Sequence, residues 1–364
     1  MTEKLAHKRI LVCPLDWGLG HAARDVAIIK RLADLGHEVI IAADGGALDL
    51  LSAEFPELET LRFRSRVRIR YSIHLPAWLK ITLLSPLLMY EVVAEHFRLR
   101  RLIRRLRPDV VISDNRYGLW NRRVTSILIT HQLSIRLPRF ASFLEYPAYQ
   151  VMKAFISKFD QCWIPDFPGD VNLSGELSHL YSPPRNAVYI GAISRFVAPD
   201  QPFSFQAVTP IDLVILLSGP EPQRSQLQKI VLKQALFLEA RCVILQGLPG
   251  NLKRTDLTPT VSMYNHLSAG ELKHLLLATD KIICRAGYTG IMDLFLMKKK
   301  TLIIPTPGQT EQEYLAEYLA GKKLFLSCDQ DDLDIEASLE ELDEFHPDFN
   351  LPEEDLLEKV IRKI

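Results

Sequence analysis

Residues 282–319, IICRAGYTGIMDLFLMKKKTLIIPTPGQTEQEYLAEYL, decide the fold of this chain. An apolar run leads into a glycine-containing turn at 285–290, and a helical segment follows. A second apolar run at Leu302–Ile304 leads into another loop and another helical segment. Short apolar runs that alternate with helical segments are typical of parallel strands joined by crossover helices. The stretch therefore predicts a doubly wound α/β domain, which binds ligands at the carboxyl ends of its strands.

The same alternation extends almost from end to end of the chain. We expect strands at Ile10–Pro14, Val39–Ala42, Val110–Ser113, Ile127–Thr130, Cys162–Ile164, Val188–Gly191, Asp212–Leu217, Cys242–Leu245, Lys281–Cys284, Leu302–Ile304 and Leu324–Ser327. Residues 194–210 contain three prolines and no periodicity, which indicates a linker. The predicted architecture is two Rossmann-like domains facing across a cleft. Its parts are a domain at 1–193, the linker at 194–210, a domain at 211–345 and a C-terminal helix within 346–364 that packs back on the first domain.

Length and composition agree with two soluble domains. The 364 residues exceed the roughly 250–300 at which a single core usually stops growing. A hydrophobic content of 48% excludes the disordered and collagen-like classes. The five cysteines stand singly without a CxxC pair, which predicts a reducing, cytoplasmic setting with neither disulfides nor a metal site. The charged amino terminus lacks a signal-peptide core, and no apolar run approaches the ~20 residues of a membrane span.

Charge is distributed unevenly along the chain. Residues 1–200 carry 27 Lys and Arg against 20 Asp and Glu, whereas residues 201–364 carry 17 against 24. Residues 329–355 include 13 acidic and no basic residues, a pattern that predicts a solvated helix face rather than a metal site. The basic excess is greatest in residues 61–107, with 12 basic residues and two glutamates. This asymmetry predicts an anionic partner for the first half.

Arginine recurs at every second position from 62 to 70, so a strand there would have one cationic face. The arginines are Arg62, Arg64, Arg66, Arg68 and Arg70, and Trp78 and an apolar segment follow. One interpretation is contact with an anionic membrane surface, at the inner face of the cytoplasmic membrane. The alternative is an edge strand followed by a half-buried helix. Nucleic-acid binding is disfavoured, because stacking aromatic residues are not interleaved with the arginines.

Three turns could hold a charged ligand, because free N–H groups at a helix start favour negative charge. The first, with Gly18 and Gly20, ends in the titratable His21. The second is Ser218-Gly219, with Arg224 in the helix that follows. The third runs through Arg285, Gly287 and Thr289 and has Asp293 one turn along, where a carboxylate could accept the hydroxyls of a ribose. The later loop to Gln309, Gln312 and Glu313 offers groups suited to sugar hydroxyls.

The stretch Cys284–Leu319 resembles the C-terminal signature of glycosyltransferase family 28, the MurG-like enzymes. The turn at 18–21 is similar to that family's glycine-rich turn ending in histidine, and Thr130-His131-Gln132 resembles its later His-Glu-Gln strand end. The resemblance implies a GT-B fold and an inverting transfer of a sugar from a UDP-sugar. The first domain would then hold the acceptor and the second the nucleotide-sugar. Residues 62–106 match nothing in the family pattern.

The resemblance also implies roles for single residues. His21 matches the histidine of the active site, and Gly287 and Thr289 fall in the phosphate-holding turn. Asp293 stands in place of a ribose-binding glutamate, and Gln312 and Glu313 in place of a Gln-Gln pair that reads the donor sugar. Glutamate at 313 only accepts hydrogen bonds, so a donor other than UDP-GlcNAc is consistent with the sequence.

An inverting transfer needs a base for the acceptor hydroxyl and a group that holds the leaving diphosphate. His21 is the candidate base, with Asp114 and His131 as rivals. No DxD-like carboxylate pair is apparent, so we expect no metal or other cofactor, and backbone N–H groups at 218–219 and 285–289 would hold the diphosphate. The acceptor is expected to be lipid-linked or close to a membrane. Two alternatives are a UDP-sugar epimerase-like enzyme and a non-catalytic nucleotide-sugar-binding subunit that docks at a membrane.

Overall fold

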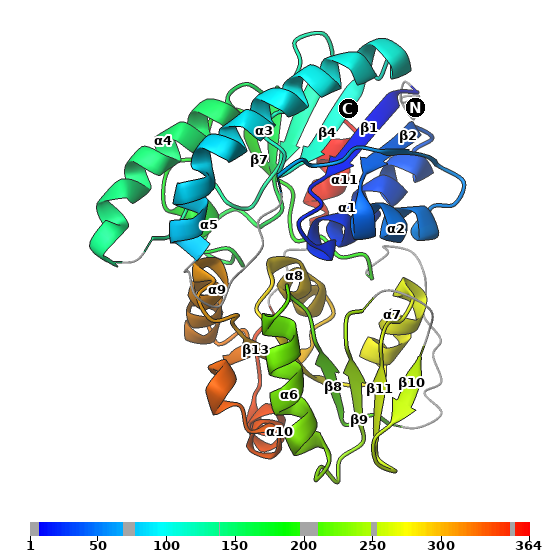
Figure 1. The fold of residues 1–364 in the computed structure, drawn as a ribbon, viewed down its shortest axis with the longest axis vertical. Helices are drawn as coiled ribbons and strands as arrows, with labels where there is room; N and C mark the ends of the chain where they lie inside the picture. Colours follow the sequence, from blue (N-terminus) through cyan, green and yellow to red (C-terminus); the bar gives the residue numbers. More distant parts are fainter. Residues whose placement is uncertain (1–6, 68–76, 138, 197–209, 249–252, 350–353) are drawn as a thin grey trace. The chain divides into compact units, whose positions relative to one another are not determined.

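The computed structural model describes residues 7–67, 77–137, 139–196, 210–248, 253–349 and 354–364, with the backbone alone for 77–82 and 139 (Figure 1). These residues form two compact units. The first contains the described residues within 1–69, 78–195 and 352–364, and the second contains those within 70–77 and 196–351. The expected linker falls mostly on residues 197–209, which lie outside the described residues.

The first unit is built on a seven-stranded sheet in the order β3-β2-β1-β4-β5-β6-β7, and every neighbouring pair of strands is parallel. The strands are β1 (Arg9–Pro14), β2 (Glu38–Ala43), β3 (Glu59–Arg62), β4 (Val110–Asp114), β5 (Thr125–Ile129), β6 (Gln161–Ile164) and β7 (Ala187–Tyr189). The helical segments are α1 (Leu19–Asp34), α2 (Gly45–Glu54), α3 (Ala77–Leu106), η1 (Arg139–Leu144), α4 (Glu145–Ile156), α5 (Glu176–His179) and α11 (Leu356–Ile361). The strand order reverses beside β1 and β4, where parallel sheets bind ligands.

Side chains alternate between the two faces of this sheet, and each face is covered by different helices. Ile10, Val12 and Ile112 lie in one core with residues of α1, α2 and α11. Leu11 and Val111 lie in the opposite core with residues of α3. The terminal helix α11 is further attached to α1 by ion pairs from Arg31 to Asp355 and Glu358. Because α1 is fixed from both sides, its first turn is held rigidly at the carboxyl end of β1.

The second unit contains another seven-stranded sheet, in the order β10-β11-β9-β8-β12-β13-β14. Its strands are β8 (Leu213–Leu216), β9 (Cys242–Leu245), β10 (Arg254–Asp256), β11 (Val261–Tyr264), β12 (Lys281–Arg285), β13 (Lys300–Ile304) and β14 (Leu326–Ser327). Its helical segments are α6 (Gln223–Ala235), α7 (Ala269–Leu277), α8 (Tyr288–Leu296), α9 (Thr310–Gly321), η2 (Gln330–Asp332) and α10 (Ile335–Glu344). All pairs are parallel except β10 with β11. The predicted α/β class with two Rossmann-like units is therefore confirmed.

The arginine-rich segment departs from the prediction of a strand. Strand β3 ends at Arg62, and residues 63–67 continue without strand pairing. The predicted alternation still holds, because Phe63, Ser65 and Val67 are buried while Arg64 and Arg66 are exposed. Side-chain contacts of this segment, rather than a ladder of backbone hydrogen bonds, set the alternation. Arg68 and Arg70 lie outside the described residues.

Candidate active site

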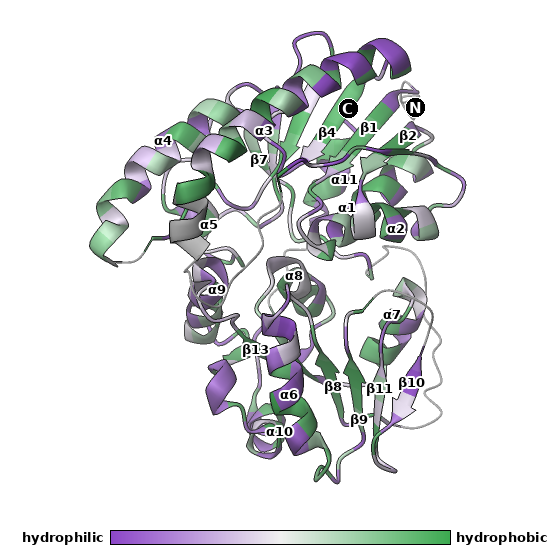
Figure 2. Cartoon of the chain, in the orientation of Figure 1, coloured by the Kyte–Doolittle hydropathy of each residue, from purple (hydrophilic) through white to green (hydrophobic). Residues whose placement is uncertain are grey.

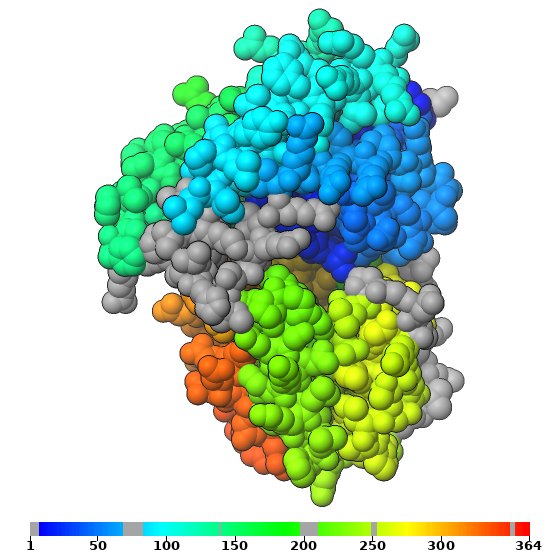
Figure 3. Space-filling view, in the orientation of Figure 1, coloured from blue at the N-terminus to red at the C-terminus, as the bar shows by residue number. Residues whose placement is uncertain are grey.

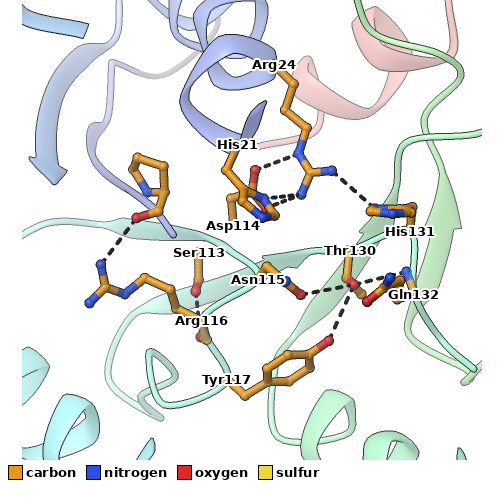
Figure 4. Close-up of polar contacts among 11 residues, drawn as sticks. His21, Arg24, Ser113, Asp114, Asn115, Arg116, Tyr117, Thr130, His131 and Gln132 are labelled. Carbon is orange, nitrogen blue, oxygen red and sulfur yellow. Dashed lines mark hydrogen bonds and ion pairs between the residues drawn. The ribbon is translucent and has the colours of Figure 1, made fainter. Parts of the chain in front are cut away.

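The first polar cluster lies where β1 and β4 end. His21 is the third residue of α1, and its Nδ1 lies 3.0 Å from Oδ1 of Asp114, the last residue of β4 (Figure 4). The Asp114 side chain is fully buried, whereas that of His21 is 20% exposed. A short connection, 15–18, brings α1 over the end of the sheet, and Gly18 at the helix start leaves open space where a side chain would stand. The imidazole is thus fixed at one nitrogen and accessible to solvent.

Arg24, which the sequence reasoning missed, is the centre of this cluster. Its Nε donates to Asp114 Oδ2 at 2.6 Å and its Nη2 to Asp114 Oδ1, a two-pronged contact between completely buried groups. Burial opposes ionisation of Asp114, but the charges of Arg24 and His21 overcome that effect and hold the pKa of Asp114 well below its usual range. Asp114 is therefore a carboxylate at neutral pH.

Arg24 also lies beside the two histidines. Its Nη2 lies 3.0 Å from His21 Nδ1, and its Nη1 lies 3.3 Å from His131 Nδ1 (Figure 4). Because the ionised Asp114 can only accept, we assign the Nδ1 proton of His21 to its Oδ1, so Arg24 Nη2 donates to Asp114 rather than to His21, and Nε2 of His21 is left as the acceptor nitrogen. His131 is 7% exposed and presents its Nδ1 as an acceptor to the guanidinium. The structure thus brings together all three predicted catalytic residues.

Polar side chains next to β4 and β5 support the cluster. Tyr117 donates to Thr130 Oγ1 at 3.4 Å, Thr130 donates to Asn115 at 3.4 Å, and the backbone N–H of Gln132 donates to Thr130 at 3.2 Å (Figure 4). Burial raises the pKa of Tyr117 well above its usual range, so this phenol remains a donor. The contacts fix the backbone around His131.

Asp25 is a second residue that sequence reasoning missed. Its side chain is fully buried, and neither carboxyl oxygen has a hydrogen bond among the described residues. Burial and then the negative charge of Asp114 raise the pKa of Asp25 well above its usual range, although Arg24 opposes the shift. The shift favours the neutral form of Asp25 beside the ionised Asp114. Its position, four residues after His21 on α1, places it on the same helix face.

The β12–α8 turn of the second unit has the geometry of a phosphate-binding helix start. Gly287 is the N-cap of α8, has an extended backbone and makes no side-chain cap. A Cβ at Gly287 would meet no atom within 4 Å, so there is open space for a ligand beside the first turn of α8, where Thr289 lies and where backbone N–H groups favour negative charge. Asp293, on the next turn of α8, is 5% exposed. Backbone donors and a carboxylate are thus combined on one helix.

The loops after β8 and β13 lie side by side at the same edge of this sheet. Gly219 has a φ of +101°, and a Cβ there would lie 3.9 Å from Thr306 Oγ1. Three buried oxygens, Gln223 Oε1, Thr306 Oγ1 and Gln309 Oε1, have no hydrogen bond among the described residues. A buried polar atom without a partner is costly unless a ligand or water satisfies it. These oxygens therefore identify a candidate polar ligand site in the second unit, together with Ser218 and Gly219.

Several predicted side chains of the second unit stabilise the fold itself. Arg285 is 2% exposed and donates to the backbone oxygens of Pro305 and Gln223, each at 3.0 Å. Arg224 donates to Glu221 and to the backbone oxygen of Gln246 at 3.2 Å. The guanidinium groups of Arg285 and Arg224 fix the loops at the sheet edge, and direct contact of either group with a ligand stays a prediction.

The predicted sugar-reading pair also shapes its own loop. Gln312 Oε1 accepts from the backbone N–H of Thr306 at 2.9 Å, and Glu313 Oε1 accepts from that of Gly308 at 2.7 Å. Gly308 has a φ of +78°, which allows the tight turn between these contacts. Glutamate suits position 313, because its carboxylate oxygen accepts the hydrogen bond from the backbone N–H of Gly308.

The structure places the first three predicted surface arginines together. Arg62 donates to buried Asp44 at 2.5 Å, and Arg66 donates to Tyr90 at 3.1 Å. No hydrogen bond or ion pair of the Arg64 side chain exists within the described residues. Trp78 falls in α3, but its side chain lies outside the described part of the chain. Within the described residues no cluster of His, Cys, Asp and Glu could hold a metal ion, and the expectation that none is needed stays a prediction.

Comparisons with known proteins agree with this description. Residues 225–357 match the family model of the glycosyltransferase family 28 C-terminal domain, which confirms the predicted resemblance there. Over 98% of its length the chain is similar in fold to the glycotransferase of kitacinnamycin, with a TM-score of 0.62, 15% identity and 94% of that chain covered. It is also similar to MurG of Acinetobacter baumannii, with a TM-score of 0.55 and 14% identity over 98% of this chain and 100% of that one.

A third structure of similar fold is the spinosyn rhamnosyltransferase SpnG complexed with thymidine diphosphate, with a TM-score of 0.58 and 17% identity over 98% of this chain and 94% of that one. A search among curated proteins found no matching sequence. The matched domain and the GT-B fold together support the prediction that the chain is a glycosyltransferase.

Proposed function

We propose that this protein transfers a sugar, with inversion, from a UDP-sugar to the hydroxyl of an acceptor. The observation that carries the proposal is the match of residues 225–357 to the family 28 C-terminal domain. The second unit of the structure has open space at Gly287 and, at Thr306 and Gln309, buried oxygens without a hydrogen bond to any described residue, which suit a diphosphate and sugar hydroxyls respectively. The donor would bind at this edge of the second sheet.

Asp293 favours a ribonucleotide over a deoxyribonucleotide, and the family resemblance favours uridine among the ribonucleotides. A carboxylate can accept hydrogen bonds from both hydroxyls of a ribose, whereas thymidine nucleotides have only one hydroxyl on that part of the sugar. SpnG is complexed with thymidine diphosphate in its structure, so thymidine diphosphate is the obvious competitor to test. Asp293 has one methylene less than the glutamate of the family pattern, and the donor would have to lie correspondingly closer to α8.

His21 would act as the general base. Its Nε2 takes the acceptor proton as the acceptor oxygen attacks the anomeric carbon, and the bond from that carbon to the diphosphate breaks. Asp114, held as a carboxylate by Arg24, stabilises the imidazolium that forms. The leaving diphosphate carries the released charge, and the N–H groups of the β12–α8 turn would hold it. A single displacement of this kind inverts the anomeric carbon.

We further propose that the first unit makes a peripheral contact with an anionic membrane. Helix α3 exposes apolar side chains that include Leu83, Tyr90 and Phe97, and η1 exposes Phe140 and Phe143. Figure 2 shows apolar segments along α3 and α4 and strongly polar final turns of α3. In the space-filling view α3, drawn in cyan, lies on the outer surface of the first unit (Figure 3). Apolar side chains beside arginines suit the interface of an anionic bilayer.

No helix within the described residues is long and apolar enough to cross a bilayer. The contact that we propose is with the surface of the membrane. A lipid-linked acceptor would then be presented to the first unit from that surface.

The activity is tested with a panel of UDP-, TDP- and GDP-sugars, by following nucleotide release with and without membrane extract. We expect slow release from one UDP-sugar, stimulation by extract, and loss of both in His21→Ala. His7→Ala, a change of an exposed histidine ahead of β1, is the control and should retain activity. Tight nucleotide binding without turnover in any extract would instead support a non-catalytic binding subunit. Release that persists in His21→Ala would contradict the assigned base.

A further inference from the structure

The first unit contains an open groove of about 490 Å³, lined by Arg62, Phe63, Arg64, Arg66 and Arg98. Its volume lies in the range of small-molecule sites. Arg98, on α3, is not part of the alternating arginine segment, so the groove joins two elements that are distant in sequence. Four guanidinium groups lining one groove repel each other unless anions are close.

Only part of this positive charge is neutralised within the protein. Asp44 pairs with Arg62 and Glu91 pairs with Arg98, and both carboxylates are buried. No carboxylate of the described residues pairs with Arg64 or Arg66. Two of the four positive charges that line the groove are therefore left for an external anion.

The groove is built rather than formed by loose surface chains. Arg98 donates to Glu91 and to the backbone oxygen of Arg64, and its Cζ lies 4.9 Å from the centre of the Phe63 ring. On the same ring, the Cζ of buried Arg116 lies 4.7 Å from the centre. The backbone N–H of Arg66 donates to Glu91 at 3.1 Å. These contacts fix the floor and one wall, which lowers the entropic cost of binding.

The groove is attached to the loop that positions the candidate base. Trp17 Nε1 donates to the backbone oxygen of Val67 at 3.2 Å, and the Ser65 hydroxyl donates to Asp16. Arg116 donates to the backbone oxygen of Pro14 at 3.2 Å (Figure 4). Asp16 and Trp17 lie directly before α1, which carries His21. A ligand in the groove is therefore bound at the same end of the sheet as His21.

We propose that this arginine groove is a binding site for a phosphate ester, and that it holds the phosphate or diphosphate group of the acceptor. Arginine forms paired hydrogen bonds with phosphate oxygens, and several arginines together prefer a multiply charged group to a single carboxylate. The acceptor part of this inference rests on the proposed transferase function, whereas the phosphate site does not. The same chemistry could be supplied by a phospholipid headgroup, and the experiment separates the two sources.

The experiment measures binding of inorganic pyrophosphate to the full-length protein by calorimetry, with the nucleotide site first saturated by UDP. Arg64→Glu is the test variant, because the Arg64 side chain is exposed and has no hydrogen-bond or ion-pair partner in the part of the chain that the structure describes. Arg101→Glu, an exposed position near the end of α3, is the matched control with the same change of charge. We expect at least a tenfold weaker pyrophosphate affinity in Arg64→Glu and less than a twofold change in Arg101→Glu. UDP affinity should be unchanged in both variants.

Vesicles distinguish the sources of the phosphate. Binding of the same variants is measured to vesicles of phosphatidylglycerol, with phosphatidylcholine vesicles as a blank. If Arg64→Glu loses pyrophosphate binding but still binds phosphatidylglycerol vesicles, the ligand is the phosphate of the acceptor. If Arg64→Glu loses both pyrophosphate binding and vesicle binding, lipid headgroups also enter the phosphate site. Unchanged pyrophosphate affinity in Arg64→Glu, or an equal loss in Arg101→Glu, would overturn the site. None of these results depends on sugar transfer, so a failure of the transferase proposal would be seen separately.

Discussion

The buried acid Asp25 gives a quantitative prediction for Asp25→Asn. In the unfolded chain an aspartate has a pKa near 3.8, whereas in the folded protein burial and the charge of Asp114 raise the pKa of Asp25 well above that value. Between the two values the folded state keeps a proton that the unfolded state releases. Stability therefore falls as pH rises, by about 1.4 kcal/mol per pH unit, from the unfolded pKa up to the folded one. Above the folded pKa this contribution becomes constant.

Asparagine has nearly the same size and carries no charge at any pH. The variant therefore loses this pH dependence and becomes more stable than the wild type as pH rises. Between pH 4.5 and 6.5 the difference in unfolding free energy should grow by about 2.7 kcal/mol if the folded pKa lies above that range. The groups that face Asp25, namely Cys13 on β1, Asp114 on β4 and Arg24 on α1, are unchanged by the substitution.

The assay is urea unfolding followed by tryptophan fluorescence at several pH values. All four tryptophans lie between residues 17 and 163, so the signal reports the first unit. Asp34→Asn, an exposed aspartate at the end of the same helix, is the control and should follow the wild type. Parallel stability curves for the wild type and Asp25→Asn would refute the assignment of a neutral acid at position 25.

Three other substitutions test the rest of the site. Asp114→Asn should lower kcat by about 10²–10⁴-fold with little change in donor affinity, because the His21 imidazolium loses the carboxylate that stabilises it. Steady-state kinetics measure this, and an unchanged kcat would contradict the catalytic pairing of Asp114 with His21. Gly287→Val should weaken nucleotide binding without lowering the melting temperature, because a side chain there meets no protein atom, whereas the control Gly270→Val in α7 should leave nucleotide binding intact. Calorimetry and thermal unfolding measure these effects, and equal nucleotide affinity in both variants would exclude the β12–α8 turn as the nucleotide site. Asp293→Ala should weaken UDP binding by about 1.5–3 kcal/mol and thymidine diphosphate binding by less; equal losses for the two nucleotides would contradict ribose recognition.

Much of the fold could be predicted from the sequence because its strands are buried on both faces. The central strands β1, β4, β8 and β12 are continuous apolar runs, which only a buried parallel sheet explains well. Strands β3 and β10 could not be found in this way. Their side chains are mostly exposed, and pairing with a neighbouring strand, rather than burial, determines their structure.

The candidate site was predicted only in part, for a physical reason. His21 and Asp114 stand at the carboxyl ends of strands, where the topology of a parallel sheet alone makes them neighbours. Arg24 and Asp25 lie inside a helix, where charged residues usually face solvent. Their spacing of three and four residues from His21 was a usable signal, because it places all three on one helix face. The sequence does not show that this face of α1 is buried, and burial of Arg24 and Asp25 is what brings their charges into contact with Asp114.

Hydrogen exchange of the full-length protein with and without UDP tests the central claim most directly. If the nucleotide-sugar binds at the edge of the second sheet, amides of residues 286–293 will exchange more slowly in the presence of UDP. Amides of residues 305–313 will exchange more slowly when a UDP-sugar replaces UDP. Protection confined to other segments, or no protection at saturating UDP, would contradict the proposed donor site.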